Sequence, residues 1–229
     1  MTSYPQPSFL PMPGTCQVIL VRHGQSMPYV DGQPFDTHDG HGDPALSPRG
    51  HWQAQLVADR LAGETIGAIY VSTLVRTHET AAPLATRVGM QPQVEADLRE
   101  VFLGEYEAGL FRKMSAENHP LALEMRRTAE WGVVPGAESN EDLRSRTVPV
   151  IERLAKEHVD ELIVVVCHGG VIGALVGHVF DQPARSMAYA RNGSITHLVV
   201  TDDHWQVRSF NDAAHIGDLT ADWDAPEGR

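Results

Sequence analysis

The sequence has little lysine and no long apolar run. Lys113 and Lys156 are the only lysines among 229 residues, and the formal net charge at pH 7 is −12. Nucleic acid, heparin and anionic membranes each attract a basic surface, so this charge argues against all three as general partners. No segment reaches the roughly 18 consecutive apolar residues of a membrane-spanning helix. The first residues also lack the basic start and apolar centre of a secretory signal, so we expect a cytoplasmic protein.

Cysteine is equally scarce. Cys16 and Cys167 are the only two, and each lies beside an apolar run that reads as a strand. If these strands are parallel, several residues at about 3.3 Å each separate the two thiols, which is too far for a disulfide. Reduced cysteines fit the cytoplasm. Because neighbouring residues of a strand point to opposite faces, we interpret Cys167 as a buried thiol and not as a nucleophile.

What the sequence does contain is a pair of apolar runs that end in histidine. VILVRHGQS, residues 18–26, leads into His23, and LIVVVCHGG, residues 162–170, leads into His168. Both runs read as buried strands. In parallel sheets, ligands bind where the strands end, so two adjacent strands could present both imidazoles to one crevice.

Strands and helices alternate along the chain. The patterns predict strands at 18–22, 66–72, 91–96 and 162–167, a closing strand pair at 194–201 and 204–210, and helices at 46–63, 74–89, 112–131, 139–158 and 171–180, with a kink or break at Pro149. This order predicts an α/β fold of three layers, with a largely parallel central sheet and helices on both faces.

Three segments fall outside that pattern. Residues 1–15 are rich in proline and read as a tail, 16–217 as one domain, and 218–229 as a C-terminal tail. The polar stretch 25–45 reads as a long loop that borders the substrate. Its HDGHGD sequence, residues 38–43, resembles a set of metal ligands but has no cysteine and no defined ligand spacing, so we predict no metal there.

The residues around His23 favour an anion site. Arg22 offers a planar fork that matches phosphate oxygens, and Gly24 lets the backbone come close to a ligand. Arg76 follows a strand at the start of a predicted helix, where backbone N–H groups also favour anions. Taken alone, Arg76 fits a solvated surface arginine as well.

Six ordered motifs carry a family resemblance. They are RHG at 22–24, LSPRG at 46–50, S-x-L-x-R-x-x-x-T-A at 72–81, L-R-E with a following G-x-Y at 98–106, PGAES at 135–139 and CHGG at 167–170. Over residues 16–217 the chain resembles the histidine phosphatase superfamily, which has the phosphoglycerate mutase-like fold, and within it the phosphatase branch.

The resemblance implies roles for individual residues. His23 matches the nucleophile that becomes phosphohistidine, and Glu100 matches the acid that protonates the leaving oxygen. Arg22 and Arg76 match the arginines that hold the phosphoryl oxygens. His168 matches the histidine that, as an imidazolium, stabilises their charge.

Two further sets of residues remain open at this stage. Glu105 and Glu107 are rivals of Glu100, which the L-x-E position favours. Tyr29 stands where many relatives have a phosphate-binding asparagine, and Gln25 is a plausible substitute. The predicted substrate-binding residues are therefore Arg22, Gln25, Arg76, His168 and Gly169.

The resemblance therefore favours a metal-independent phosphomonoester hydrolase that needs no cofactor and acts on a small phosphorylated substrate. A cofactor-dependent phosphoglycerate mutase is the first alternative, because it uses the same catalytic residues. A non-catalytic protein that binds phosphorylated ligands is the second. Arg112 and Lys113 could add positive charge at the mouth of the site, and a solvated helix start explains them equally well. The sequence is compatible with a homodimer.

Overall fold

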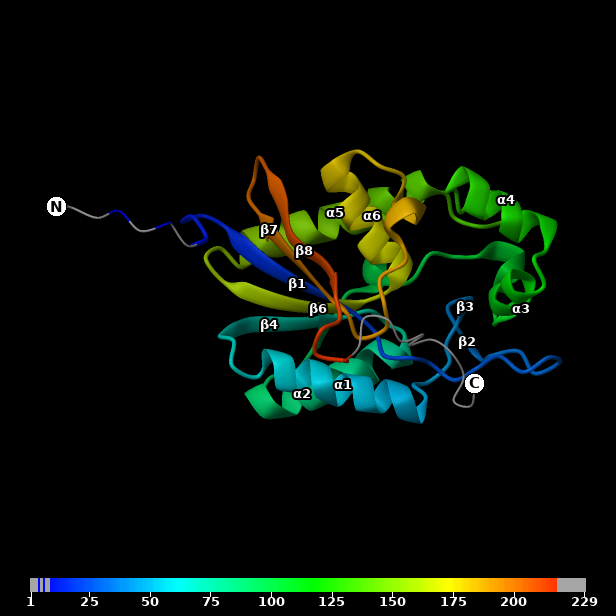
Figure 1. Cartoon of the computed structure of the whole chain (residues 1–229), viewed down its shortest axis with the longest axis horizontal. Helices are drawn as coiled ribbons and strands as arrows, with labels where there is room; N and C mark the ends of the chain where they lie inside the picture. Colours follow the sequence, from blue (N-terminus) through cyan, green and yellow to red (C-terminus); the bar gives the residue numbers. More distant parts are fainter. Residues whose placement is uncertain (1–3, 5, 7–8, 218–229) are drawn as a thin grey trace.

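The computed structural model describes residues 4, 6 and 9–217. The predicted C-terminal tail lies outside this range. The described part of the proline-rich N-terminal stretch contains no helix or strand before Cys16, and in Figure 1 it extends away from the sheet. Within the described residues, no helix is long and apolar enough to cross a membrane.

A mixed, largely parallel sheet forms the middle layer. Its strands are β1 (Cys16–Arg22), β4 (Ile66–Val71), β5 (Gln93–Val94), β6 (Leu162–Cys167), β7 (Ile195–Val200) and β8 (Trp205–Asp212), in the spatial order β5-β4-β6-β1-β7-β8. The first four are parallel to their neighbours among themselves, whereas β7 runs antiparallel to β1 and to β8. The predicted strand alternation and closing pair are confirmed. Two strands, β1 and β6, lie side by side at the centre.

Helices cover both faces of the sheet, which confirms the three predicted layers. In Figure 1, α1 and α2 lie on one face and α5 and α6 on the other. The helices are α1 (Pro48–Leu61), α2 (Val75–Val88), α3 (Leu110–Ala116), α4 (Pro120–Thr128), α5 (Asn140–Glu157) and α6 (Gly169–Phe180), with short 3-10 turns η1 (Ala96–Leu98), η2 (Gly104–Tyr106) and η3 (Ala184–Met187). Ile19 and Val21 pack towards α1 and α2, and Val18 and Leu20 towards α5 and α6.

Capping side chains mark the starts of two helices, and two predictions about helices are corrected. Ser47 caps α1 by accepting the N–H of Gly50, and Ser139 forms a capping box with Asp142 at the start of α5. The single helix predicted at 112–131 is two helices, α3 and α4, separated by residues 117–119. The predicted break at Pro149 is wrong, because α5 continues through it. Pro149 is exposed, so water can solvate the Ser145 carbonyl group that loses its helical partner.

The long loop after β1 is more ordered than its composition indicates. It contains a small hairpin of β2 (Thr37–His38) and β3 (His41–Gly42). His41 packs edge-on against Phe102, at 5.2 Å between ring centroids, and Asp39 pairs with Arg99 at 2.7 Å. The hairpin is thus held against the segment that follows η1.

Candidate active site

The fold brings His23 and His168 together. Arg22 of β1 pairs with Cys167 of β6, so the next residue of each strand is a histidine at the same level. Val21 and Val166 belong to the core on the α1–α2 side, and residues two apart on a strand share a face. The two imidazoles therefore lie on one side, with ring centroids 5.2 Å apart. The predicted meeting of the two strand ends is confirmed.

The His23 ring is fixed in one orientation. Its Nδ1 lies 2.7 Å from the carbonyl oxygen of Gly24, which can only accept, so Nδ1 carries the proton. Nε2 is then the nitrogen with the free lone pair. Burial, and next the charges of Arg76 and Arg22, lower the pKa of His23 well below 6.5. His23 is therefore neutral, as a nitrogen nucleophile must be.

His168 departs from the expected imidazolium. It is fully buried, and burial together with Arg76 holds its pKa well below 6.5. Its Nε2 lies 2.8 Å from the hydroxyl of Ser72, and its Nδ1 has no hydrogen-bond partner among the described residues. A neutral His168 can donate one hydrogen bond but adds no full positive charge. In the unliganded protein, burial and the neighbouring arginines therefore disfavour the imidazolium, and an imidazolium beside a bound phosphoryl group stays a prediction.

These two histidines make stability depend on pH. The unfolded chain binds protons at His23 and His168 below a pKa of about 6.5, whereas the folded chain keeps both neutral. The free energy of unfolding is expected to fall as pH drops below about 6.5, by up to roughly 1.4 kcal/mol per pH unit for each histidine. Urea midpoints at several pH values should show this slope. It should become shallower in a His23→Gln/His168→Gln double variant, with a remainder from His197 and His215, whose pKa values burial also lowers. It should persist in His51→Gln, which changes an exposed residue. An unchanged slope in the double variant would contradict the assignment.

Three arginines converge beside the histidines. Arg76 is 7% exposed and donates from Nη1 to the Gly42 carbonyl oxygen at 3.1 Å. Arg22 donates from Nη1 to the Ala190 carbonyl oxygen at 2.5 Å. Arg112 reaches back from α3 to Ser26 and Met27, at 2.7 and 2.6 Å.

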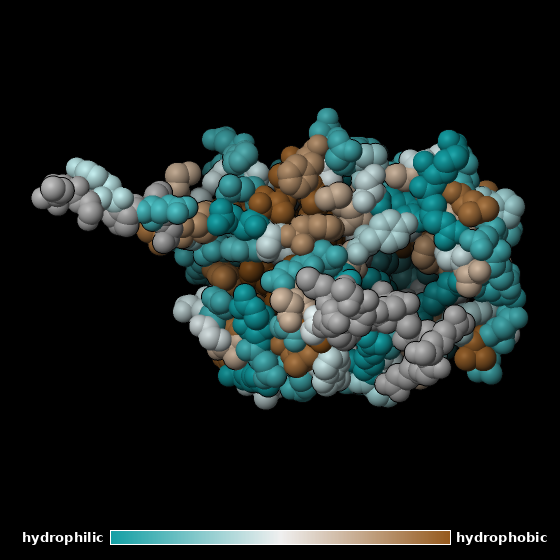
Figure 2. Space-filling model, in the orientation of Figure 1, coloured by the Kyte–Doolittle hydropathy of each residue, from teal (hydrophilic) through white to brown (hydrophobic). Residues whose placement is uncertain are grey.

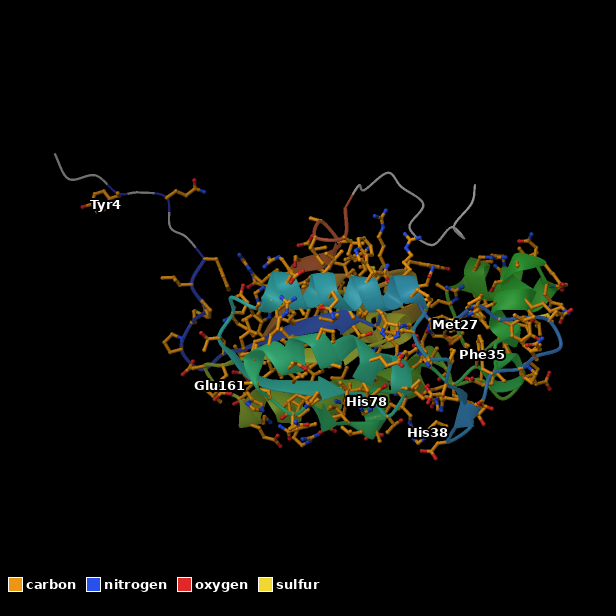
Figure 3. All side chains as sticks on the ribbon, turned by 90° about the horizontal axis from the view of Figure 1, so that it is seen from below. Tyr4, Met27, Phe35, His38, His78 and Glu161 are labelled. Carbon is orange, nitrogen blue, oxygen red and sulfur yellow. The ribbon has the colours of Figure 1, made fainter. Side chains whose placement is uncertain are left out.

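Arg112 belongs to this positive field. Burial, and then the charges of Arg76 and Arg22, lower its pKa to about 10. Its guanidinium lies 5.0 Å from the centre of the Phe35 ring, and Figure 3 shows Phe35 and Met27 near α3 at the same end of the molecule. Lys113, by contrast, pairs with Asp31 at 2.8 Å. Arg112 therefore adds charge to the site, and the sequence alone left this open.

Glu100 is tied to the His168 motif. One carboxylate oxygen accepts the N–H groups of Val101 at 2.9 Å and Gly170 at 3.0 Å. A Cβ at Gly170 would lie 2.4 Å from that oxygen, so the second glycine of CHGG is required for the contact. Glu107 uses both oxygens to hold the N–H groups of Leu103 and Gly42, both at 2.8 Å. This gives Glu107 a structural contact, and Glu105 is exposed. We therefore keep Glu100 as the candidate acid.

The segment that carries Glu100 is held by a pair that the sequence did not reveal. Arg146 of α5 donates to the carbonyl oxygens of Asp97, Arg99 and Glu100, at 2.6, 2.9 and 3.0 Å. It also forms a two-pronged ion pair with Glu138, at 2.6 and 2.8 Å. Glu138 lies in the PGAES motif, which was recognised without a role. Glu138 also accepts the N–H of Phe102 at 3.1 Å, so this motif helps to anchor the backbone on both sides of Glu100.

Asp43 is a second residue that the sequence did not reveal. Its carboxylate accepts the N–H of Val75 at 2.8 Å and lies 3.6 Å from Arg76 Nη1. The N-cap of α2, Leu74, has no capping side chain of its own. Asp43 therefore caps α2 from the long loop and restrains Arg76 at the same time.

Replacing Asp43 should destabilise the protein, by an amount that depends on the side chain that takes its place. We expect Asp43→Ala to lower the free energy of unfolding by about 1–2 kcal/mol, because it removes the cap and the partner of a buried arginine. Asp43→Asn keeps an oxygen that can accept from Val75 and should lose less. Chemical denaturation measures both, with the exposed Asp202→Asn as the control. Equal stability of Asp43→Ala and the parent would contradict the capping role.

Gln25 and Gly169 lie at the edge of the site. Gln25 accepts the Ser47 hydroxyl on its side-chain oxygen at 2.8 Å, so its role as a phosphate ligand stays a prediction. Gly169 starts α6 beside Arg22, and a Cβ there would lie 3.4 Å from Arg22 Nε. Tyr29 packs edge-on against Phe35, with ring centroids 5.9 Å apart. Its ring also packs on Gly109, where an added Cβ would lie 2.3 Å from it.

The remaining sequence candidates lie elsewhere or are inert. His38 and His41 face each other across the β2–β3 hairpin, and within the described residues no three His, Cys, Asp or Glu side chains are grouped as metal ligands would be. Cys167 is fully buried, and burial raises the pKa of its thiol, which confirms the interpretation as an inert thiol. Burial likewise raises the pKa of Cys16 to about 12.

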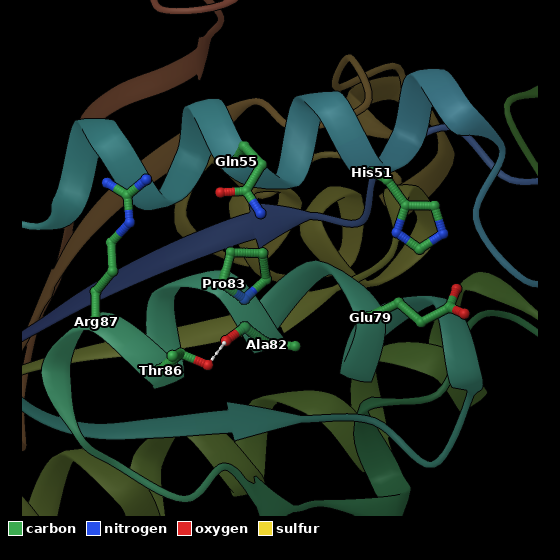
Figure 4. A pocket seen from close by; sticks show the side chains of 7 residues that line it. All are labelled: His51, Gln55, Glu79, Ala82, Pro83, Thr86 and Arg87. Atoms are coloured by element: carbon green, nitrogen blue, oxygen red, sulfur yellow. Dashed lines mark hydrogen bonds between the residues drawn. The ribbon is translucent and has the colours of Figure 1, made fainter.

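A surface groove between α1 and α2 is separate from this site. Figure 4 shows its lining side chains, His51, Gln55, Glu79, Ala82, Pro83, Thr86 and Arg87. None of the predicted site residues belongs to it. The groove therefore lies apart from the strand ends that carry the two histidines.

The comparison with protein families agrees with this geometry. The family described as "Histidine phosphatase superfamily (branch 1)" matches residues 18–213. The chain belongs to the histidine phosphatase superfamily.

Members of the superfamily with different names resemble the chain. Phosphoglycerate mutase-like protein 4 of Arabidopsis thaliana is 32% identical over 205 residues, which cover 87% of this chain and 86% of that protein. The metal-independent phosphoserine phosphatase of the same plant is 30% identical over 207 residues, covering 89% and 84%. The structure of a mycobacterial glucosyl-3-phosphoglycerate phosphatase is 28% identical, covers 87% of this chain and 100% of that one, and superposes with a TM-score of 0.70. Phosphatases and a mutase-like protein are thus both similar to this superfamily member.

Proposed function

We propose that the protein is a metal-independent phosphomonoester hydrolase that acts through a phosphohistidine on His23. The observation that carries the proposal is the contact between His23 Nδ1 and the Gly24 carbonyl, which leaves Nε2 as a neutral nucleophile among Arg22, Arg76 and His168. We assign catalysis to residues 16–217, the location to the cytoplasm, and the substrate to small phosphorylated molecules.

In the first step, Nε2 of His23 attacks the phosphorus atom of the bound ester. The N–P bond forms as the bond between phosphorus and the alcohol oxygen breaks, and Glu100 gives its proton to that oxygen. Arg22 and Arg76 hold the phosphoryl oxygens throughout, and His168 donates one hydrogen bond to them. Positioning and charge neutralisation supply most of the catalysis in phosphoryl transfer. These side chains are of the types that the reaction requires.

In the second step, Glu100 acts as a base. Its carboxylate takes a proton from a water molecule, the water oxygen bonds to phosphorus, and the N–P bond breaks. Inorganic phosphate leaves, and His23 returns to its neutral form with Glu100 protonated again. The one residue thus serves as acid and base in turn.

One observation favours the alternative to a hydrolase, a phosphoglycerate mutase. Arg112 adds a further positive charge beside Arg22 and Arg76, and a mutase must bind two phosphates of a bisphosphate. The segment LGEYEAG, residues 103–109, is compact and acidic, which favours hydrolysis. A non-catalytic binding protein is the weaker alternative, because nucleophile, acid and clamp residues are all present.

The proposal is tested by trapping the intermediate. The protein is mixed with p-nitrophenyl phosphate and EDTA, at about pH 5.5 and at neutral pH, and quenched in alkali, in which phosphohistidine survives. We expect nitrophenol release in EDTA and one phosphoryl group on the peptide that contains His23. Activity that requires an added metal, or a phosphoryl group on another residue, would refute the proposal. Conversion of 3-phosphoglycerate to 2-phosphoglycerate that depends on bisphosphoglycerate would establish the mutase instead.

A further inference from the structure

A buried arginine outside the catalytic set lies near the site. Arg185 in η3 is 4% exposed and lies between two aromatic rings, at 4.6 Å from the centre of Trp131 and 5.3 Å from that of Tyr189. Its Nη1 donates to the Tyr189 hydroxyl at 2.6 Å. The hydroxyl and the two rings are neutral groups, so they orient the guanidinium without neutralising it.

The charge of Arg185 lacks an anionic partner. Within the described residues, no carboxylate forms an ion pair with it. Its Nε and the indole N–H of Trp131 are both buried without a hydrogen-bond partner. A buried cation without an anion is costly, and so is each unsatisfied donor. Such an arrangement is retained at a cost in stability, which is typical of a binding group that waits for its ligand.

The backbone around Arg185 leads directly to the catalytic residues. A Cβ at Gly173 of α6 would lie 2.3 Å from the Ala184 carbonyl oxygen, so only glycine allows η3 to pack this closely on the helix. The chain then continues towards the start of α6, where a Cβ at Gly169 would lie 2.9 Å from the Ala188 carbonyl oxygen. Two residues later, the Ala190 carbonyl oxygen accepts from Arg22. Tyr189 therefore lies between two residues that contact the site.

Aromatic contacts also connect Arg185 to α3, the helix that carries Arg112. Trp131 contacts Phe111 of α3, with ring centroids 6.1 Å apart, and Phe111 precedes Arg112. Figure 2 shows the surface hollowed between the part built by α3 and α4 and the part built by α6 and η3. Low exposure does not exclude a ligand, because Arg76 in the catalytic set is only 7% exposed.

The geometry points to Arg185 as a substrate-binding residue that recognises a carboxylate on the alcohol part of the phosphomonoester. The inference rests on the proposed function, and it narrows the substrate class to phosphorylated carboxylic acids. A single guanidinium whose Nη1 is already used matches one negative charge better than a second phosphate dianion. Arg22 and Arg76 would hold the phosphoryl group, and Arg185 would hold the acid group released with the alcohol.

The test compares two substrates that differ in one group. 3-Phosphoglycerate carries a carboxylate where glycerol 3-phosphate carries a neutral hydroxymethyl group. We expect the parent to prefer 3-phosphoglycerate in kcat/KM, and Arg185→Met to reduce that preference by about 10- to 100-fold, mainly through KM. Arg127→Met, a matched change at an exposed arginine of α4, should keep the preference. Arg185→Lys keeps the charge without the planar fork and should give an intermediate preference.

A binding measurement separates this inference from the proposed function. Calorimetry on the His23→Ala protein compares the affinities for the two esters without turnover, with and without Arg185→Met. If the parent hydrolyses neither ester nor p-nitrophenyl phosphate, the proposed function fails, and calorimetry still decides the role of Arg185. Equal losses for both esters in Arg185→Met would overturn the inference, and so would a parent that prefers glycerol 3-phosphate. If Arg185→Met fails to fold, Arg185→Lys and Tyr189→Phe replace it. A reduced preference for 3-phosphoglycerate over glycerol 3-phosphate in these variants then supports the inference, and an unchanged preference overturns it.

Discussion

Replacing His23 with alanine should reduce kcat/KM for p-nitrophenyl phosphate by roughly 10⁴-fold or more. The variant loses the only nitrogen nucleophile with a fixed free lone pair in the site, since Nε2 of His168 is engaged with Ser72. The loss should appear in kcat, because the arginines that bind the phosphoryl group remain. Steady-state kinetics with an alkali-quenched phosphorylation assay measures both quantities.

A matched control separates the nucleophile from the neighbouring thiol. Cys167→Ala removes the buried thiol next to His168 and should leave hydrolysis close to the parent level, since burial keeps that thiol protonated. Parental turnover by His23→Ala would end the mechanism proposed here. Strong loss in Cys167→Ala with a folded protein would point to a cysteine nucleophile instead.

Replacing Arg76 with alanine should lower kcat/KM by about 10³-fold. Arg76 is nearly buried and its guanidinium is held by Gly42 and Asp43, so no other side chain can take its place. Arg76→Lys should recover only part of the loss, because an ammonium group cannot bind two phosphoryl oxygens with the same planar geometry. Inhibition by orthovanadate, an analogue of the phosphoryl group, should weaken in parallel.

The control for Arg76 lies on the same helix. Arg87→Ala removes an arginine that pairs with Asp59 near the other end of α2 and should leave turnover and inhibition unchanged. Activity of Arg76→Ala close to that of the parent would show that this buried arginine does not hold the phosphoryl group.

The residues that we propose to contact the transferred phosphoryl group were accessible from the sequence because each sits in a local motif. A run of apolar residues that ends in a polar one predicts a buried strand that opens into a crevice, and this holds for His23 and for His168. The alternation of side chains along a strand adds the direction of the two imidazoles. Residues two apart share a face, so the positions of Val21 and Val166 fix the side on which both imidazoles lie. Arg76 was singled out by its place at a helix start, and the resemblance to a family then favoured its role in the site and supplied Glu100.

The protonation state of His168 was not accessible in the same way. A pKa depends on desolvation and on charges from distant segments, and the sequence does not state how deeply a side chain is buried. For His168 complete burial favours the neutral form, and the charge of Arg76, contributed by α2, acts in the same direction. The sequence therefore identified the residue but not its charge.

The sequence by itself determined the alternating strands and helices and the set of residues able to handle a phosphoryl group, because both follow from short-range periodicity and motif chemistry. Only the tertiary structure decided which other residues position that set and which could select the substrate. Asp43 caps a helix that begins 32 positions later, Arg146 holds a backbone segment 46 to 49 positions earlier, and no carboxylate among the described residues forms an ion pair with Arg185. Such contacts arise where separate segments pack together, and local sequence carries no record of which partners will meet.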